Sequence, residues 1–170
     1  MTADPRPRTP PSPFTVIPAF VIGTAGGLGL SSVAPGTMGT IAGIPLAMWA
    51  ARFPLDAQLL IWLVIAIVGV WAASVITAFS GNSDDQRIVI DEVVGYGITT
   101  LAAGHNGLGY LYAFCIFRFF DVVKLPPVRQ VDQWSKLQTD ATNKNGFSPW
   151  RAGLGVVLDD ILAGVQGLIV

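Results

Sequence analysis

Long apolar stretches without a charged side chain dominate the pattern of residues along the chain. The longest lies between Arg8 and Arg52, where 43 consecutive residues include no Asp, Glu, Lys or Arg. A second stretch contains the apolar run Leu59–Phe79, whose 21 residues are enough for a helix that crosses a hydrocarbon core of about 30 Å. The alternative is a buried helix of a large soluble core, but 170 residues offer too little polar sequence to enclose one. The pattern therefore predicts a membrane protein.

The spacing of these stretches predicts an all-α fold, a polytopic membrane helical bundle. Short segments at 80–87 and 104–107 separate the apolar runs, and 124–151 is the one long polar segment. Several runs are short for a full crossing, so we expect tilted or half-buried helices. The predicted helices cover residues 36–51, 55–79, 88–103, 108–123 and 152–170.

The amino-terminal residues have a different composition. Residues 1–13 contain five of the twelve prolines and no apolar run, which predicts a disordered proline-rich tail and not a signal peptide. The apolar stretch Phe14–Leu30 follows, but Pro18 and several glycines disfavour one continuous helix. We therefore expect an interfacial or re-entrant segment there. Residues 14–170 form a single predicted domain.

Composition narrows the class of protein and the kinds of site. Hydrophobic residues make up 52% of the chain and charged residues 12%, against about a quarter charged in ordinary soluble domains. The net charge of −1 provides no general electrostatic attraction to nucleic acid. Cys115 and His105 are the one cysteine and the one histidine of the sequence. An intrachain disulfide and a zinc site built from several Cys and His ligands are therefore excluded.

The basic residues predict the orientation of the bundle in the membrane. Arg52 is the only one predicted on the opposite side, where His105 also lies. The positive-inside rule then places the tail, the loop at 80–90 and the segment 124–151 in the cytoplasm. The basic residues on that side are Arg6, Arg8, Arg87, Lys124, Arg129, Lys136, Lys144 and Arg151.

Acidic residues collect at the predicted cytoplasmic side of three helices, at the start of two of them and at the end of the third. Like charges this close repel each other, and some would stay protonated unless a cation lies between them. Hard oxygen ligands without His or Cys suit Mg²⁺ or Mn²⁺. The alternative is that the helix dipole favours carboxylates at helix amino termini, but this does not explain Asp121 at a helix carboxyl terminus. The candidate metal ligands are Asp91, Glu92, Asp121, Asp159 and Asp160.

Basic and small residues near these acids favour an anionic substrate, for which phosphate is the obvious candidate. Arg118, Asp121 and Lys124 are spaced three apart and therefore lie near one helix face. The alternative is that Arg118 only pairs with Asp121, and that Lys124 extends to the membrane interface. Gly36 and Thr37 lie at a predicted helix start, where free backbone N–H groups can hold a phosphate oxygen.

Several other catalytic mechanisms need residues that the sequence does not contain or that are predicted elsewhere in the bundle. The sequence contains no GxxxxGK[ST] loop and no Asp-x-Asp pair of the haloacid dehalogenase type. Cys115 lies in an apolar run and is expected in the core, not as a nucleophile. His105 is predicted on the face opposite the acids, which disfavours a histidine nucleophile or a Ser–His–Asp triad. Carboxylates, a metal ion and a water molecule remain as the predicted chemistry.

Four motifs follow one another along the chain: Gly29–Ile41 (GLSSVAPGTMGTI), Ile90–Gly95 (IDEVVG), Phe117–Asp132 (FRFFDVVKLPPVRQVD) and Gly153–Gly164 (GLGVVLDDILAG). They resemble the motifs of the phosphatidylglycerophosphatase A family and occur in the family's order. The resemblance implies an all-helical enzyme of the bacterial inner membrane with its acidic motifs gathered together. It also implies hydrolysis of phosphatidylglycerophosphate to phosphatidylglycerol and phosphate, with Mg²⁺ required.

With this resemblance, the working hypothesis is metal-assisted hydrolysis of a phosphate monoester by a single helical membrane phosphatase domain, residues 14–170. The five carboxylates would supply ligands to Mg²⁺, and one of them would act as general base. Arg118 and Lys124 would clamp the phosphoryl group, while Gly36 and Thr37 would complete its pocket. The expected partner is a phospholipid in the membrane, and the oligomeric state stays open.

Two rival functions belong to other classes. A small ion-coupled transporter or channel would use the acids to line a path, and it predicts acids at several membrane depths. A non-catalytic membrane scaffold would tolerate neutral replacement of all five acids. The positions of the carboxylates in the fold discriminate between a path and a shared site.

Overall fold

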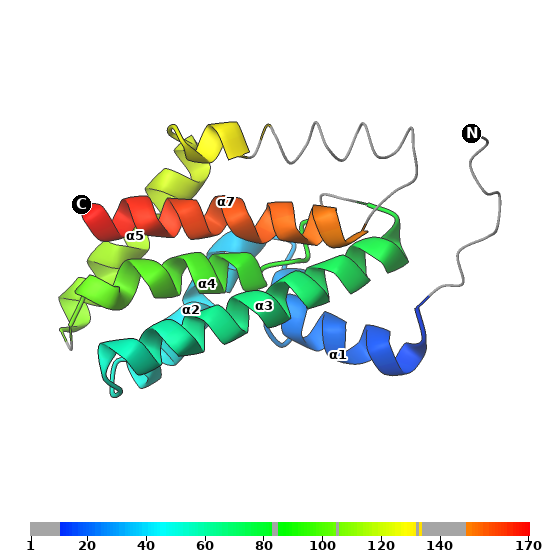
Figure 1. Ribbon diagram of the computed structural model, residues 1–170, viewed down its shortest axis with the longest axis horizontal. Helices are drawn as coiled ribbons and strands as arrows, with labels where there is room; N and C mark the ends of the chain where they lie inside the picture. The colour runs from blue at the N-terminus through cyan, green and yellow to red at the C-terminus, as the bar shows by residue number, and fades with distance from the viewer. Residues whose placement is uncertain (1–10, 83–84, 105, 132, 134–148) are drawn as a thin grey trace.

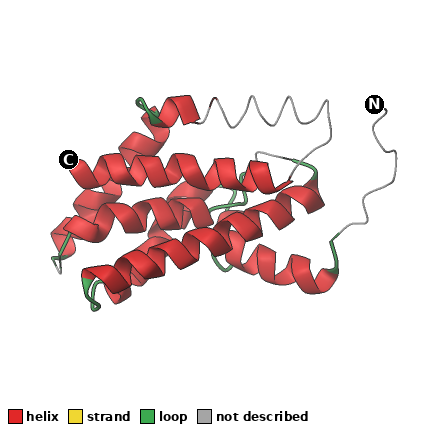
Figure 2. Cartoon of the chain, viewed as in Figure 1, coloured by secondary structure: helices red, strands yellow, loops and turns green. Residues whose placement is uncertain are grey.

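The computed structural model describes residues 11–82, 85–104, 106–131, 133 and 149–170. These residues form helices and their connections, and none of them belongs to a β-strand (Figure 2). Most of the predicted tail and most of the polar segment 124–151 lie outside the described residues. The elements are α1 (Pro13–Gly23), η1 (Leu28–Leu30), α2 (Pro35–Ala50), α3 (Leu55–Ser80), α4 (Ile90–Thr99), η2 (Thr100–Ala102), α5 (Gly107–Val123) and α7 (Pro149–Ile169).

The observed helices confirm the predicted all-helical fold. Four of them begin and end within two residues of the prediction, when the 3₁₀ turn η2 is counted with α4. The last helix, α7, begins at Pro149, three residues earlier than predicted. Two helices, Leu55–Ser80 and Trp150–Ile169, are long and apolar enough to cross a membrane. With ten residues, α4 is far too short for a crossing, which confirms the expectation of short elements.

The apolar amino-terminal stretch forms one helix and then a break. α1 continues through Pro18 and ends at Gly23. Gly26 follows with a φ of 71°, a left-handed backbone that glycine adopts without strain. α1 packs against α3, where the rings of Phe20 and Phe79 meet edge to face at 5.9 Å. The predicted interruption of the helix is therefore confirmed.

The short helix α4 lies at the centre of the bundle. It packs against α2, α3, α5 and α7, and Figure 1 shows it between α3 and α7. Apolar residues and glycines of α4 lie on all sides of the helix, and eight of its ten residues are buried. The side chains of its first turn are consequently enclosed by neighbouring helices.

Glycines allow α4 and α7 to approach closely. A Cβ added at Gly95 would lie 2.6 Å from the backbone oxygen of Asp160, and one added at Gly164 would overlap the backbone oxygen of Gly95. One turn further along α4, Thr99 Oγ1 donates to the carbonyl oxygen of Gly164 at 3.2 Å. Small residues at such spacing are typical of close helix contacts in membranes. This contact places Asp160 beside the first turns of α4.

α2 and α5 bring their polar ends to the same place. α2 lies alongside α4, because Gly39 and Gly43 leave room for Val89 and Tyr96 respectively. α5 runs in the opposite direction to α4, since Tyr96 near the end of α4 donates its hydroxyl to the carbonyl oxygen of Tyr110 near the start of α5, at 3.1 Å. The carboxyl end of α5 therefore reaches the amino ends of α2 and α4.

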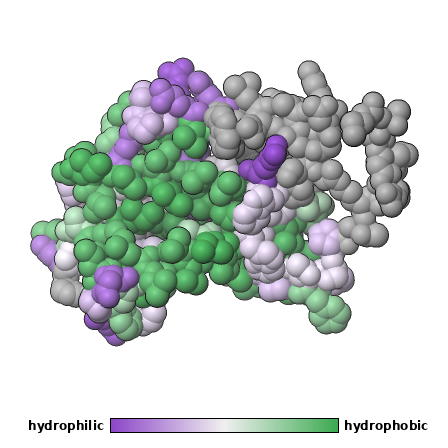
Figure 3. Space-filling view, viewed as in Figure 1, coloured by the Kyte–Doolittle hydropathy of each residue, from purple (hydrophilic) through white to green (hydrophobic). Residues whose placement is uncertain are grey.

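The outer surface of the bundle is strongly apolar. On α3 the side chain of Leu60 is 61% exposed, and on α5 that of Val122 is 69% exposed. Figure 3 shows apolar residues over most of the described part of the face that it draws. Soluble monomers rarely expose apolar patches of this extent, so the surface favours a lipid environment.

Candidate active site

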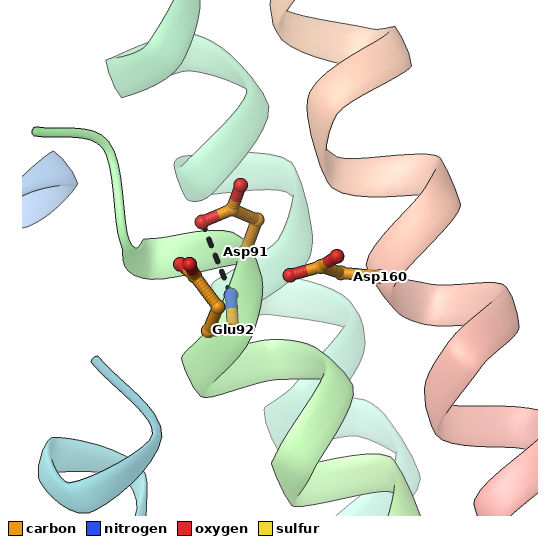
Figure 4. Close-up of side chains that lie close together, drawn as sticks. All are labelled: Asp91, Glu92 and Asp160. Atoms are coloured by element: carbon orange, nitrogen blue, oxygen red, sulfur yellow. Dashed lines mark hydrogen bonds between the residues drawn. The ribbon is translucent and has the colours of Figure 1, made fainter. Parts of the chain in front are cut away.

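Three carboxylates from two helices meet beside the first turn of α4. Asp91 and Glu92 belong to that turn, and Asp160 comes from the middle of α7 (Figure 4). One oxygen atom from each of the three lies within 4.8 Å of the others. Asp91 and Asp160 are buried, with 7% and 5% of their surface exposed. We call these three residues the carboxylate cluster, and its oxygen atoms are of the type that a small divalent cation binds.

The carboxylate cluster carries an electrostatic cost. Burial removes the hydration that stabilises a charged carboxylate, and like charges nearby add repulsion. Asp91 Oδ1 accepts a hydrogen bond from the Glu92 backbone N–H at 3.1 Å, at a helix end where the dipole also favours negative charge. Glu92 Oε2 is buried and has no hydrogen-bond partner among the described residues. A positive charge between the three side chains would offset both the burial and the repulsion.

The start of α2 and the carboxyl half of α5 lie against one side of the cluster. A Cβ added at Gly36 would overlap Glu92 Oε1 and lie 3.1 Å from Arg118 Nη1, so both side chains end beside this glycine. Arg118 Nη1 also donates to Asp121 Oδ2 at 2.5 Å. Thr37 lies in the same first turn of α2, which has no side-chain cap within the described residues. The amide groups of such a turn can bind an anion.

The five predicted metal ligands divide into two groups in the structure. Three form the carboxylate cluster, whereas Asp121 and Asp159 each bind a basic side chain. Asp121 pairs with Arg118, as the alternative reading of their spacing predicted. Asp159 Oδ2 accepts a hydrogen bond from Lys124 Nζ at 2.8 Å. Lys124 therefore reaches across to α7 and joins the two helices.

We expect Lys124 and Asp159 to stabilise the contact between α5 and α7 as a pair. Their side chains are 31% and 11% exposed, so solvent screens the interaction only in part. Lys124→Met and Asp159→Asn should each lower the free energy of unfolding by about 1 kcal/mol, and the double variant should lose less than the sum. Unfolding of the four proteins in detergent measures this coupling, with the exposed Arg129→Met as control. Strict additivity would contradict the pairing.

The carboxylate cluster lies level with the middle of α3. A Cβ added at Gly69 would lie 3.3 Å from Ile90 Cγ2, so α4 begins beside the central part of that helix. Eleven residues of α3 follow Gly69, which corresponds to about 16 Å of helix. The first half of α7 lies along the same part of α3, where Gly153 packs on Ser74. The three acids of the cluster thus lie at one level, which is well inside the length of α3.

The loop between α3 and α4 contains an ion pair that was not singled out from the sequence. Arg87 Nε donates to Asp85 Oδ1 at 2.8 Å, and the guanidinium lies over the Phe20 ring at 5.3 Å. The hydrogen bond from Arg87 holds the pKa of Asp85 below its usual value. The Val89 N–H donates to the carbonyl oxygen of Gly23 at 2.8 Å. These contacts hold the loop against α1. The Asp-x-Arg spacing was the feature of the sequence from which this ion pair could have been predicted.

Two residues set aside on sequence grounds have different outcomes. Cys115 was expected in the core, and this was wrong, because it is exposed on α5. An apolar helix that faces lipid exposes apolar residues on its outer side, so apolar neighbours did not imply burial. His105 lies outside the described residues.

Sequence comparisons identify the family. The sequence model of the phosphatidylglycerophosphatase A family matches residues 21–170. The chain belongs to this family. Phosphatidylglycerophosphatase A of Escherichia coli strain K12 is 32% identical, over 87% of this chain and 78% of that protein. The Haemophilus influenzae protein of the same name is 32% identical, over 90% and 86%.

A further relative in the comparisons has a different name. A provisionally named phosphatidylinositol-3-phosphatase of Bacteroides thetaiotaomicron is 36% identical, over 89% of this chain and 92% of that protein. No solved structure matches the chain. Membership of the phosphatidylglycerophosphatase A family confirms the resemblance seen in the four motifs. Together with the two helices long enough to cross a bilayer, it indicates that the protein associates with membranes.

Proposed function

We propose that the protein hydrolyses the phosphate monoester of phosphatidylglycerophosphate and releases phosphatidylglycerol and inorganic phosphate. Family membership and two relatives named for this activity support the substrate. The observation that carries the proposal is the carboxylate cluster, which lies next to Arg118 and the uncapped start of α2. Acidic oxygens for a cation and donors for an anion are the two sets of groups that metal-assisted phosphate hydrolysis requires.

The residues of the carboxylate cluster fit Mg²⁺. Asp91, Glu92 and Asp160 would hold the ion, and the other two predicted ligands would stay in their ion pairs. All three offer hard oxygen atoms, and buried Glu92 Oε2 lacks a hydrogen-bond partner in the described part of the chain. When bound, Mg²⁺ would lower the pKa of a coordinated water molecule and offset the charge of the phosphate oxygens.

The basic groups bind the phosphoryl group, and a carboxylate accepts a proton. Arg118, oriented by Asp121, donates to the phosphate oxygens, as do the amide groups of Gly36 and Thr37. Lys124 adds a second positive charge at the same end of α5. Water attacks the phosphorus atom, the bond between phosphorus and the glycerol oxygen breaks, and a carboxylate of the cluster accepts the proton that the water loses. The departing glycerol oxygen takes up a proton from solvent.

In the proposed arrangement the protein is a multi-pass protein of the bacterial inner membrane, and its active site opens toward the cytoplasm. Exposed apolar side chains of α1 support the position in the membrane. Phe14, Ile17 and Val21 share one helix face, and they extend the apolar surface beyond the level of the acids. The distribution of basic residues supports the cytoplasmic orientation. The acyl chains of the substrate stay in the bilayer, while its headgroup reaches the carboxylate cluster.

Hydrolysis of phosphatidylinositol 3-phosphate is the second candidate function. It is favoured by the 36% identity to the Bacteroides thetaiotaomicron relative. Both lipids carry a phosphate monoester on a membrane glycerophospholipid, so the same groups would serve either substrate. An ion-coupled transporter or channel has less support, because three of the acids form one cluster and do not line a path.

Phosphate release by the purified protein in detergent tests both candidates. With Mg²⁺ we expect phosphatidylglycerophosphate to be hydrolysed at least about tenfold faster than phosphatidylinositol 3-phosphate, because each tenfold needs only about 1.4 kcal/mol of preference. EDTA should lower the rate at least about 100-fold. Return of activity on adding Mg²⁺ controls for denaturation. Faster release from the inositol lipid would support the second candidate, and activity insensitive to EDTA would reject the metal.

A further inference from the structure

Gly36 occupies a point where three helices meet at the active site. It is the second residue of α2. A Cβ added there would overlap Glu92 Oε1 of α4, and it would lie 3.1 and 3.4 Å from the two terminal nitrogens of Arg118 on α5. The space that a side chain at this position would take is therefore filled by the ends of two oppositely charged side chains.

Other glycines of the bundle make a different kind of contact. A Cβ at Gly39 would lie 2.8 Å from the backbone oxygen of Val89, and one at Gly95 would lie 2.6 Å from that of Asp160. A backbone atom cannot yield unless its helix moves, so these two glycines are needed for packing. The three nearest atoms at Gly36 all belong to side-chain ends, which can rotate away. A side chain there would displace charges and leave the helices in place.

We propose that Gly36 is a positioning residue, whose missing side chain sets where the Glu92 carboxylate lies relative to the other two acids of the cluster. The inference rests on the proposed function. Arg118 is held by Asp121 at 2.5 Å, whereas Glu92 Oε2 has no partner among the described residues, so the glutamate is the group that yields. A side chain at position 36 thus disturbs the carboxylate cluster more than the binding of phosphate by Arg118.

Gly36→Ala tests this role against a matched control, Gly107→Ala. Gly107 also begins a helix, and a Cβ there meets nothing within 4 Å. Alanine is a better helix former than glycine, so both variants should melt at or above the wild-type temperature. For Gly36→Ala we expect kcat with phosphatidylglycerophosphate to fall about 10- to 100-fold, with KM within about threefold of wild type. Gly107→Ala should keep both parameters.

A shorter acid at position 92 provides the rescue experiment. Aspartate lacks one methylene group, so its carboxylate ends short of the space that a side chain at Gly36 would fill. Glu92→Asp should lower kcat by itself, but adding Gly36→Ala in that background should lower it by less than about a further twofold. Mn²⁺ binding, followed by the loss of the free-ion electron paramagnetic resonance signal, is a readout independent of turnover. Gly36→Ala should weaken this binding about tenfold, and Gly107→Ala should not.

The outcomes separate this inference from the proposed function. A wild type that hydrolyses neither lipid contradicts the proposed function and removes the basis for the positioning role. An active wild type with an equally active Gly36→Ala variant contradicts the positioning role alone. So does a tenfold further loss in the Glu92→Asp background, or a melting temperature of Gly36→Ala that falls together with kcat. A selective loss of kcat that the shorter acid relieves supports it.

Discussion

Replacing Asp160 with asparagine should reduce phosphate release about 100- to 1000-fold and should change how Mg²⁺ affects stability. Asparagine has nearly the same shape, so the packing of α7 on α4 is kept. The substitution removes one of three carboxylates that lie within 4.8 Å of one another. In EDTA the loss of repulsion should raise the melting temperature of the variant above that of wild type. In Mg²⁺ the wild type gains stability by binding the ion, so the order should reverse.

Thermal unfolding in detergent, followed by circular dichroism with EDTA and with Mg²⁺, measures this reversal beside the phosphate assay. Asp56→Asn is the control, because Asp56 is an exposed carboxylate in the first turn of α3. It should change neither activity nor the response to Mg²⁺. An Asp160→Asn variant with more than about a tenth of wild-type activity, or with an unchanged response to Mg²⁺, would show that Asp160 is not a ligand.

The helices of this protein were predictable because the signal for each is local. The run Leu59–Phe79 lies wholly within α3, and no distant contact was needed to recognise it. The break after α1 was also visible, since Gly26 and its glycine neighbours disfavour a helix. The length of α1 was harder to predict, because Pro18 disfavours a helix locally, whereas the packing of Phe20 on Phe79 stabilises it from outside.

The ion pairs around the candidate site were only partly predictable from the sequence. Arg118 and Asp121 are three residues apart on one helix, so their ion pair could be seen in the spacing. Lys124 and Asp159 are 35 residues apart, and their ion pair depends on how α5 and α7 pack. Lys124 also follows α5 with a φ of 47°, a turn that residue spacing does not reveal.

The level of the carboxylate cluster within the bundle depends on how helices of unequal length are offset. A hydrophobic pattern predicts where α3 and α4 begin and end in the sequence. It does not predict how far one helix is displaced along the axis of the other. The contact between Gly69 and Ile90 determines this shift and places the start of α4 beside the middle of α3. In the proposed cytoplasmic orientation, the carboxylate cluster therefore lies deeper in the bilayer than the α3 carboxyl end.

Gly95→Ala should lower the free energy of unfolding by about 3 kcal/mol and remove activity as well. The added Cβ would lie 2.5 Å from a ring carbon of Phe117 and 2.6 Å from the backbone oxygen of Asp160. The ring can rotate, but the backbone oxygen moves only if α7 moves away from α4. Such a shift would withdraw the Asp160 carboxylate from the cluster, so the stability and the activity fall together.

This joint loss distinguishes a glycine that holds two helices together from an acid that acts in the reaction. Asp160→Asn should lose activity and gain stability in EDTA, whereas Gly95→Ala should lose both activity and stability. Chemical unfolding in detergent measures the difference, with Gly107→Ala as control, because the Cβ of that variant meets open space and alanine favours a helix by up to about 1 kcal/mol. If Gly95→Ala unfolds within about 0.5 kcal/mol of wild type, close contact at this glycine does not hold α7 against α4, and the position of Asp160 must depend on other contacts.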